Sequence, residues 1–244
     1  MLTFDKTIPN NVSLAEKYFT QAEELRFDNK YKESIDKYLH SILINKNNVS
    51  SYVGLAIAYK QIKNYDKAIT NLKKAEKILP DNFTVQKELA LCNIINGNFE
   101  EGMKHLIASI RIEPENVDMQ MQLALVHEMM EEEDMALMIY QKIIECRPDY
   151  LRAYIQKATL YMHLEDYYNS AKLFLKVIKL NPDYYRAYLA IGICYEKLGN
   201  IRSAKRFYKK YLGFSSQAHN SEEISKRIYK LNSQKENINN LRIV

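Results

Sequence analysis

Four prolines in this chain of 244 residues are evenly spaced, because Pro80, Pro114, Pro148 and Pro182 lie 34 residues apart. A fixed period of this size is typical of repeat architectures, in which each repeat is one supersecondary unit that packs on its neighbours. With proline at repeat position 32, the period extends without a gap over residues 15–218. The sequence therefore predicts six repeats of 34 residues, at 15–48, 49–82, 83–116, 117–150, 151–184 and 185–218.

Within each repeat, two positions are always small and one is always large. Position 8 is Ala22, Ala56, Ala90, Ala124, Ala158 and Gly192. Position 20 is Ser34, Ala68, Gly102, Ala136, Ser170 and Ala204, and position 24 is Tyr38, Leu72, Leu106, Tyr140, Phe174 and Tyr208. Helices whose axes approach to about 8–10 Å need small side chains where they cross. These columns predict two packed helices in each repeat, with the large residue filling the space beside the crossing.

Helix ends are also marked in the sequence. An Asn or Asp precedes the second helix at Asn64, Asn98, Asp166 and Asn200, where its side chain is expected to accept from orphan backbone N–H groups. Each proline is expected to end the second helix. Ser13 and Glu16 form a capping box that predicts the start of the first helix. With only 6 Gly and 5 Pro in the chain, the turns must be short and the fold all-α.

This pattern resembles the tetratricopeptide repeat family. The residues that carry the resemblance best are Tyr188, Ile191, Gly192, Tyr195, Ala204 and Tyr208. The resemblance covers about five-sixths of the chain and implies a right-handed α-solenoid of helix-turn-helix repeats. A pentatricopeptide interpretation is disfavoured, because that unit is one residue longer and would drift out of register. The central repeats depart from the pattern, with Gln86, Asn93, Gln120 and His127 in place of aromatic residues.

Two segments flank the repeats. Residues 1–14 form an N-terminal extension, and residues 219–244 are expected to form a capping helix with a frayed tail beyond about Asn232. A capping-box pair, Asn220 and Glu223, precedes the expected helix. Its buried face is predicted to carry Ile224, Ile228 and Leu231, and its outward face Lys226, Arg227 and Lys230.

The resemblance implies that the first helices line a concave groove that binds a peptide or helix of a partner protein. Repeat positions 2, 5, 6, 9, 12 and 13 face that groove, starting with Phe19, Glu23 and Phe27. The candidate groove residues are Val53, Ile57, Lys60, Lys87, Leu91, Ile94, Ile95, Met121, Gln122, Leu125, Met129, Arg152, Ile155, Gln156, Met162, His163, Arg186, Leu189 and Ile193. In an alternative interpretation, part of this apolar stripe is buried between neighbouring repeats.

Some family members hold a partner's terminal carboxylate with a clamp of Lys, Asn and Arg. The nearest analogue here is Lys87, Gln122 and Arg152. Leu91 and Gln156 stand where that clamp needs an Asn and a second cation, so charge recognition at two points is incomplete.

No catalytic or cofactor site is expected. His127-Glu128-x-x-Glu131 lacks the second His of the zinc motif, and no glycine-rich phosphate loop occurs. The remaining histidines make no catalytic constellation. We therefore predict no enzymatic activity, no cofactor, no metal and no small-molecule substrate, with other proteins or peptides as partners.

Charge and cysteine content supply the alternative function and the expected location. Residues 185–244 carry 12 Lys and Arg against 4 Asp and Glu, so nucleic-acid or anionic-surface binding at this basic end is the alternative. No segment predicts a membrane span or a secretory signal. Cys92, Cys146 and Cys194, an odd number, are expected as buried thiols in a cytoplasmic protein.

Overall fold

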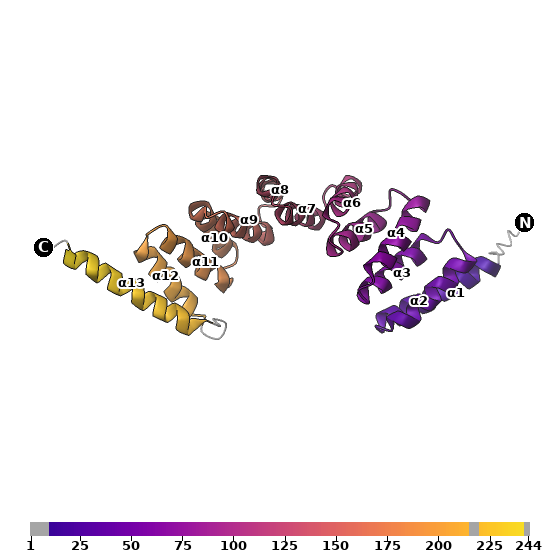
Figure 1. The fold of residues 1–244 in the computed structure, drawn as a ribbon, viewed down its shortest axis with the longest axis horizontal. Helices are drawn as coiled ribbons and strands as arrows, with labels where there is room; N and C mark the ends of the chain where they lie inside the picture. Colours follow the sequence, from indigo (N-terminus) through magenta and orange to yellow (C-terminus); the bar gives the residue numbers. More distant parts are fainter. Residues whose placement is uncertain (1–9, 215–219, 242–244) are drawn as a thin grey trace, which may run out of the picture. The chain divides into compact units, whose positions relative to one another are not determined.

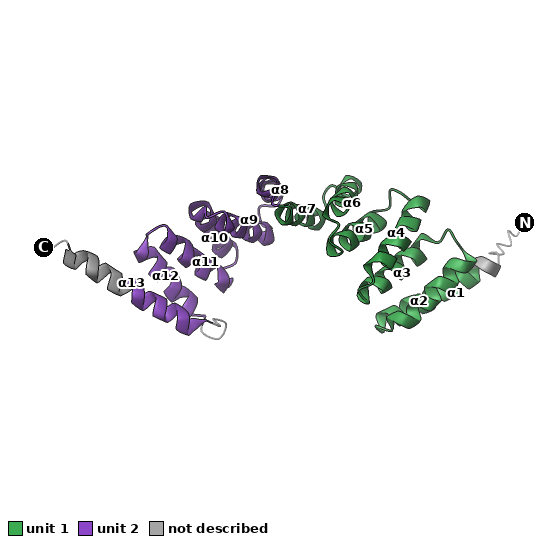
Figure 2. Cartoon of the chain, in the orientation of Figure 1, with its two compact units in different colours: residues 1–130 green, residues 131–244 purple. Residues whose placement is uncertain are grey.

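A computed structural model describes residues 10–214 and 220–241, and every regular element in that part of the chain is a helix (Figure 1). The chain divides into two compact units, Met1–Met130 and Glu131–Val244 (Figure 2). The boundary falls inside the expected fourth repeat, 117–150. In the described part of the chain, no helix is both long and apolar enough to cross a membrane.

The helices follow one another with short turns. The first unit contains α1 (Asn10–Phe27), α2 (Tyr31–Ile44), α3 (Val49–Gln61), α4 (Tyr65–Ile78), α5 (Phe83–Ile95), α6 (Phe99–Ile112) and α7 (Val117–Met129). The second unit contains α8 (Glu133–Cys146), α9 (Leu151–His163), α10 (Tyr167–Leu180), α11 (Tyr185–Lys197), α12 (Ile201–Leu212) and α13 (Ser221–Leu241).

Within each unit, every helix packs against the one before it and the one after it. In the first unit α1 packs on α2, α2 on α3, and so on to α7. In the second unit the same succession runs from α8 to α13. Each unit is therefore a stack of antiparallel helices, and the all-α solenoid fold predicted from the sequence is confirmed. The described helices are compatible with six repeats followed by one terminal helix.

The small and large positions pack as the sequence predicts. Every residue at positions 8 and 20 is buried, and the large residues at position 24 are at most 4% exposed. Gly192 gives the tightest case: a Cβ atom there would lie 2.5 Å from the ring of Tyr208. The absence of a side chain at this point lets the ring lie directly against α11.

The turn inside each repeat contains one residue with positive φ. These residues, all at position 15, are Asn29 (60°), Lys63 (61°), Gly97 (84°), Glu131 (58°), Glu165 (59°) and Gly199 (74°). The left-handed conformation brings Cβ close to the following carbonyl oxygen, which glycine avoids and asparagine tolerates. Three of the six turns, at Lys63, Glu131 and Glu165, therefore carry a strained residue.

Three of the four expected caps form. Asn64 Oδ1 accepts from the Lys67 N–H at 3.2 Å, and Asp166 and Asn200 make the same contact three residues ahead. Asn98 does not cap α6, because its Nδ2 instead donates to Asn93 Oδ1 at 3.4 Å. The start predicted at Ser13 is also wrong, since α1 begins at Asn10 and Ser13 lies within it.

Each of the four repeat prolines follows the end of a helix, and its carbonyl oxygen accepts a hydrogen bond. The helices α4, α6, α8 and α10 all end two residues before a proline. The proline carbonyl oxygen then accepts from position 4 of the next repeat. The four donors are Gln86 Nε2 (2.8 Å), Gln120 Nε2 (2.7 Å), Tyr154 Oη (3.1 Å) and Tyr188 Oη (3.0 Å). The two glutamines that depart from the family pattern thus keep the contact that tyrosine makes elsewhere.

The terminal helix α13 packs on α12, with Ile224 and Leu231 buried as predicted. Arg227, expected to face outward, instead donates from Nε to Glu196 Oε2 of α11 at 2.8 Å. The tail expected to fray beyond Asn232 is helical to Leu241. Of the cysteines, Cys92 and Cys194 are buried, whereas Cys146 is exposed, contrary to the expectation for all three.

The strained turns generate a test. Replacing Lys63 by glycine is expected to stabilise the protein by about 0.5–1 kcal/mol, because the relief of left-handed strain exceeds the added entropy of the unfolded chain. Thermal unfolding followed by circular dichroism should show a higher Tm. Lys73→Gly, in the exposed interior of α4, is the matched control and should lower the Tm. A fall in Tm for Lys63→Gly as large as the control's would contradict this assignment of strain.

Candidate protein-binding surface

The first helices of the first unit line a cavity of about 260 Å³. Its wall is formed by α1 and α3, which lie side by side, together with the residues that begin α5. The lining residues are Phe19, Glu23, Arg26, Val49, Ser50, Val53, Gly54, Ile57, Asn82 and Thr84. Four of these, Phe19, Glu23, Val53 and Ile57, belong to the groove set that the repeat positions predicted.

Two of the lining residues, Glu23 and Arg26, form an ion pair that also contacts Tyr38. Arg26 Nη2 donates to Glu23 Oε2 at 2.5 Å, and Arg26 Nε donates to Tyr38 Oη at 3.2 Å. The Tyr38 hydroxyl in turn donates to Glu23 Oε1. Burial raises the pKa of the Glu23 carboxyl, but hydrogen bonds from Arg26 and Tyr38 outweigh it, and the pKa lies below its ordinary value. The carboxylate therefore stays ionised and fixed.

A second charged cluster joins α3 to α5. Lys60 Nζ donates to Glu88 Oε2 at 2.5 Å, and Lys87 Nζ lies 3.8 Å from Glu88 Oε1. Glu88 is buried, with a side chain only 8% exposed, so two lysines surround one buried carboxylate.

The sequence analysis named Lys60 and Lys87 as groove residues but not Glu88, Arg26 or Gly54. Glu88 and Gly54 are at repeat position 6 and Arg26 is at position 12, and both are groove positions that would have identified them.

The groove residues of the first unit on α3, α5 and α7 differ in exposure. Ile95 and Met129 are exposed, at 55% and 59%. Half-buried residues are Val53, Ile57, Leu91, Ile94, Gln122 and Leu125. Met121 is fully buried, so its side chain does not belong to an accessible surface. Some of the stripe is therefore accessible and some is packed between helices, and partner binding by the accessible part stays a prediction.

In the second unit the candidate residues lie on α9 and α11. Arg152, His163 and Arg186 are exposed, and Gln156 is half-buried. The apolar members Ile155, Met162, Leu189 and Ile193 are half-buried and pack against the core of this unit. The apolar surface available here is thus narrower than in the first unit.

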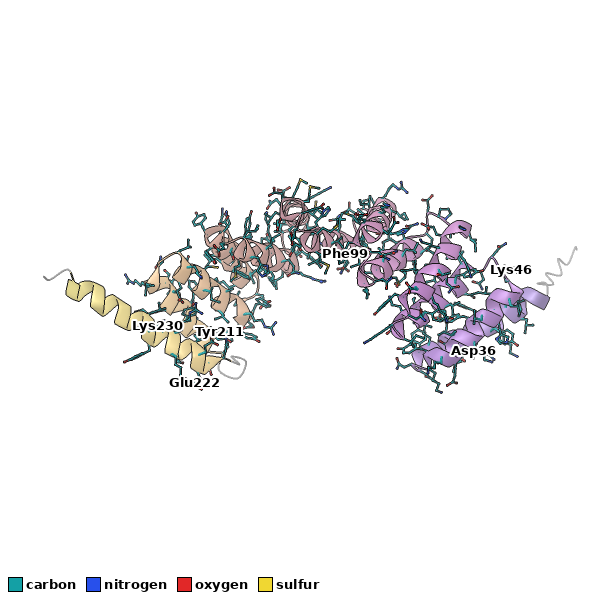
Figure 3. All side chains as sticks on the ribbon, viewed as in Figure 1. Asp36, Lys46, Phe99, Tyr211, Glu222 and Lys230 are labelled. Atoms are coloured by element: carbon teal, nitrogen blue, oxygen red, sulfur yellow. The ribbon has the colours of Figure 1, made fainter. Side chains whose placement is uncertain are left out.

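The basic end is partly neutralised. Lys226 Nζ lies 2.6 Å from Glu222 Oε1, and Arg227 pairs with Glu196, so two of its cations have acidic partners (Figure 3 labels Glu222). Tyr211, also labelled there, donates from Oη to Asn220 Oδ1 at 2.5 Å and so ties the segment before α13 to α12. Within the described residues, no group of three or more His, Cys, Asp or Glu side chains is placed to hold a metal ion.

Models of one protein family match three segments of the repeat region. Family models described as tetratricopeptide repeat match residues 49–82, 151–184 and 173–206. Two of these segments coincide with predicted repeats. No curated protein sequence matches the chain significantly.

Solved structures share the fold. The C-terminal part of a TPR repeat-containing protein from Cytophaga hutchinsonii superposes with a TM-score of 0.78 at 17% identity, over 89% of this chain and 90% of that one. PilF of Pseudomonas aeruginosa gives 0.65 at 12%, over 89% and 99%. YrrB, described as a TPR protein with an unusual peptide-binding site, gives 0.61 at 17%, over 78% and 97%. At these identities the likeness establishes the fold alone.

The Glu23 network generates a pH prediction. Because its folded pKa is lowered, ionised Glu23 stabilises the fold at pH values above the unfolded value of 4.5, and this stability is lost as the pH falls through the folded pKa. Glu23→Gln should therefore lower the unfolding free energy at pH 7 by about 1 kcal/mol. Urea unfolding should show the difference from wild type shrinking with acidification. Glu24→Gln, the exposed neighbour, should show no such difference; equal effects of the two variants would refute the network's role.

Proposed function

The chain belongs to the tetratricopeptide repeat family, and from that premise we propose that it is a non-enzymatic scaffold that binds other proteins. The proposed site is the first-helix surface of the first unit, formed by α1, α3, α5 and α7. This surface binds a peptide or a helix of the partner. Family membership supports the scaffold role, since repeat folds carry function in their exposed surfaces rather than in a catalytic centre.

The cavity between α1 and α3 is the observation that carries the proposal. Its apolar side, Phe19, Val53 and Ile57, offers burial to a partner's side chain. Gly54 makes room for the Tyr38 ring, which lies where a Cβ atom would stand. The Glu23–Arg26 pair in its lining is already hydrogen-bonded and holds its geometry before a partner arrives. A preformed site of this kind limits the entropy lost on binding.

The surface continues from the cavity toward α5 with Leu91 and Ile95. Apolar side chains on an exposed helix face are stabilised when a partner covers them, which favours an amphipathic helix or an extended peptide. The described peptide-binding site of YrrB, which has the same fold, is consistent with this choice. We place the protein in the cytoplasm, a location that the free, buried thiols of Cys92 and Cys194 support.

Charge insertion into the surface tests the proposal. Ile57→Glu and Leu91→Glu should each weaken capture of partner proteins from native lysate by about thirtyfold, as for a central interface residue contributing about 2 kcal/mol. Thr70→Glu, on the exposed face of α4, is the matched control and should capture the same proteins as wild type.

Circular dichroism and thermal unfolding should first establish that all variants are folded. Capture by the wild type should respond weakly to salt, because the contact is largely apolar. If folded Ile57→Glu and Leu91→Glu proteins retain every partner at wild-type levels, the first-helix surface is not the binding site.

A further inference from the structure

We infer that the second unit carries a separate binding site, a cleft on α10 that fits an acidic segment of a partner protein anchored by an apolar side chain. This α10 cleft has a volume of about 400 Å³. It is lined by Tyr154 of α9 and by Lys172, Leu173, Leu175, Lys176 and Lys179 of α10. Because α10 is a second helix, the α10 cleft is distinct from the first-helix surface, and the inference does not rest on the proposed function.

The charge of α10 is positive only. Its sequence from Tyr167 to Leu180 contains three lysines and no acidic residue. Lys172, Lys176 and Lys179 are spaced by four and three residues, which places them on one face of the helix. In the part of the chain that the structure describes, none of the three has an ion-pair partner, unlike Lys60 or Lys104. The rim of the α10 cleft therefore presents uncompensated positive charge.

The interior of the α10 cleft is apolar. Leu173 and Leu175 are half-buried and pack against the core of the unit. Tyr154 is only 6% exposed, and its hydroxyl donates to the carbonyl oxygen of Pro148 at 3.1 Å. The interior thus offers a ligand no free hydroxyl donor, and the group that enters gains most if it is apolar. An aliphatic or aromatic side chain meets this requirement.

These features favour a protein segment over nucleic acid or a membrane. Single-stranded nucleic acid binds by stacking bases on exposed aromatic rings, whereas the Tyr154 ring is buried. The exposed Tyr168 of α10 does not line the cleft. Membrane binding requires apolar side chains that project beyond the charges, whereas Leu173 and Leu175 are less exposed than Lys172 and Lys179 at the rim. Carboxylates that pair with the lysines while one apolar side chain enters the cleft satisfy both parts of the site.

The chain contains a matched comparison helix. On α4, Lys74 and Lys77 occupy the same repeat positions as Lys176 and Lys179, but α4 also carries Asp66 and Glu76. The double variant Lys74→Glu/Lys77→Glu therefore makes the same charge change at equivalent places. It separates recognition at the α10 cleft from general attraction to a basic protein.

Fluorescence anisotropy of the full chain with a synthetic peptide probe tests the inference. The probe is a helix-forming peptide in which leucines recur every fourth residue among glutamates. Two companion probes replace all glutamates by glutamine or all leucines by serine. We expect the Glu/Leu probe to bind the wild type at least about tenfold more tightly than either companion. Lys176→Glu/Lys179→Glu should weaken Glu/Leu binding by about tenfold, and Lys74→Glu/Lys77→Glu should leave it unchanged.

Any of the following results would overturn the inference. Undiminished binding to Lys176→Glu/Lys179→Glu places the probe elsewhere. Equal weakening by the α4 control means that general charge attraction explains binding. A single-stranded RNA or a phosphatidylserine vesicle that competes better than the Glu/Leu probe assigns the lysines to another class of ligand. The first-helix surface could also bind an amphipathic probe, so the two lysine variants are compared again in the Ile57→Glu background. The same difference between them there shows binding at the α10 cleft whether or not the first-helix surface binds a partner.

Discussion

The close approach of paired helices at small residues is the constraint on which the structure depends. Alanine, glycine or serine stands where the two helices of a repeat cross, and one large buried residue fills the space beside each of these crossings. The contact between Gly192 and the Tyr208 ring leaves no room for even a methyl group. In the first unit, α1 lies beside α3 and α3 beside α5, and this arrangement contributes to the first-helix surface.

Much of the fold could be predicted because its determinants are local and periodic. The crossings, the proline stops and most caps recur at fixed positions and need no knowledge of distant residues. Asn98 shows the limit: its neighbour Asn93 competes for its side chain, and only the folded geometry reveals that competition. Gln86 and Gln120 looked like departures, although their amides reach the same proline carbonyls as tyrosine hydroxyls do. Position 4 therefore keeps a side chain that can donate a hydrogen bond to the proline carbonyl oxygen, although the residue type changes.

The binding surface was harder to predict, because exposure depends on contacts between helices. Met121 and Met129 occupy groove positions eight residues apart, yet one is fully buried and the other largely exposed. Glu88 occupies groove position 6 but was not among the candidates, and Lys60 from the preceding repeat compensates its burial. Arg227 was expected on the outward face of an amphipathic helix, whereas it pairs with Glu196, 31 residues earlier.

The two proposed sites, the first-helix surface and the α10 cleft, differ in the kind of contact that they offer a partner. The first-helix surface offers apolar contact framed by ion pairs that are already satisfied, so its specificity comes from shape. The α10 cleft offers unpaired positive charge around an apolar interior, so it selects acidic segments. A scaffold that bears both can hold two partners, or two segments of one partner.

Site-specific photocrosslinking tests the central claim most directly, because it maps contact without perturbing charge. A photoreactive phenylalanine analogue placed at residue 57 or residue 91 should yield adducts with the same partner protein in native lysate. The analogue at residue 70, on the exposed face of α4, should not yield them. Adducts that form equally from residue 70, or from none of these positions while the partner is still captured, would contradict the claim that the first helices form the binding surface.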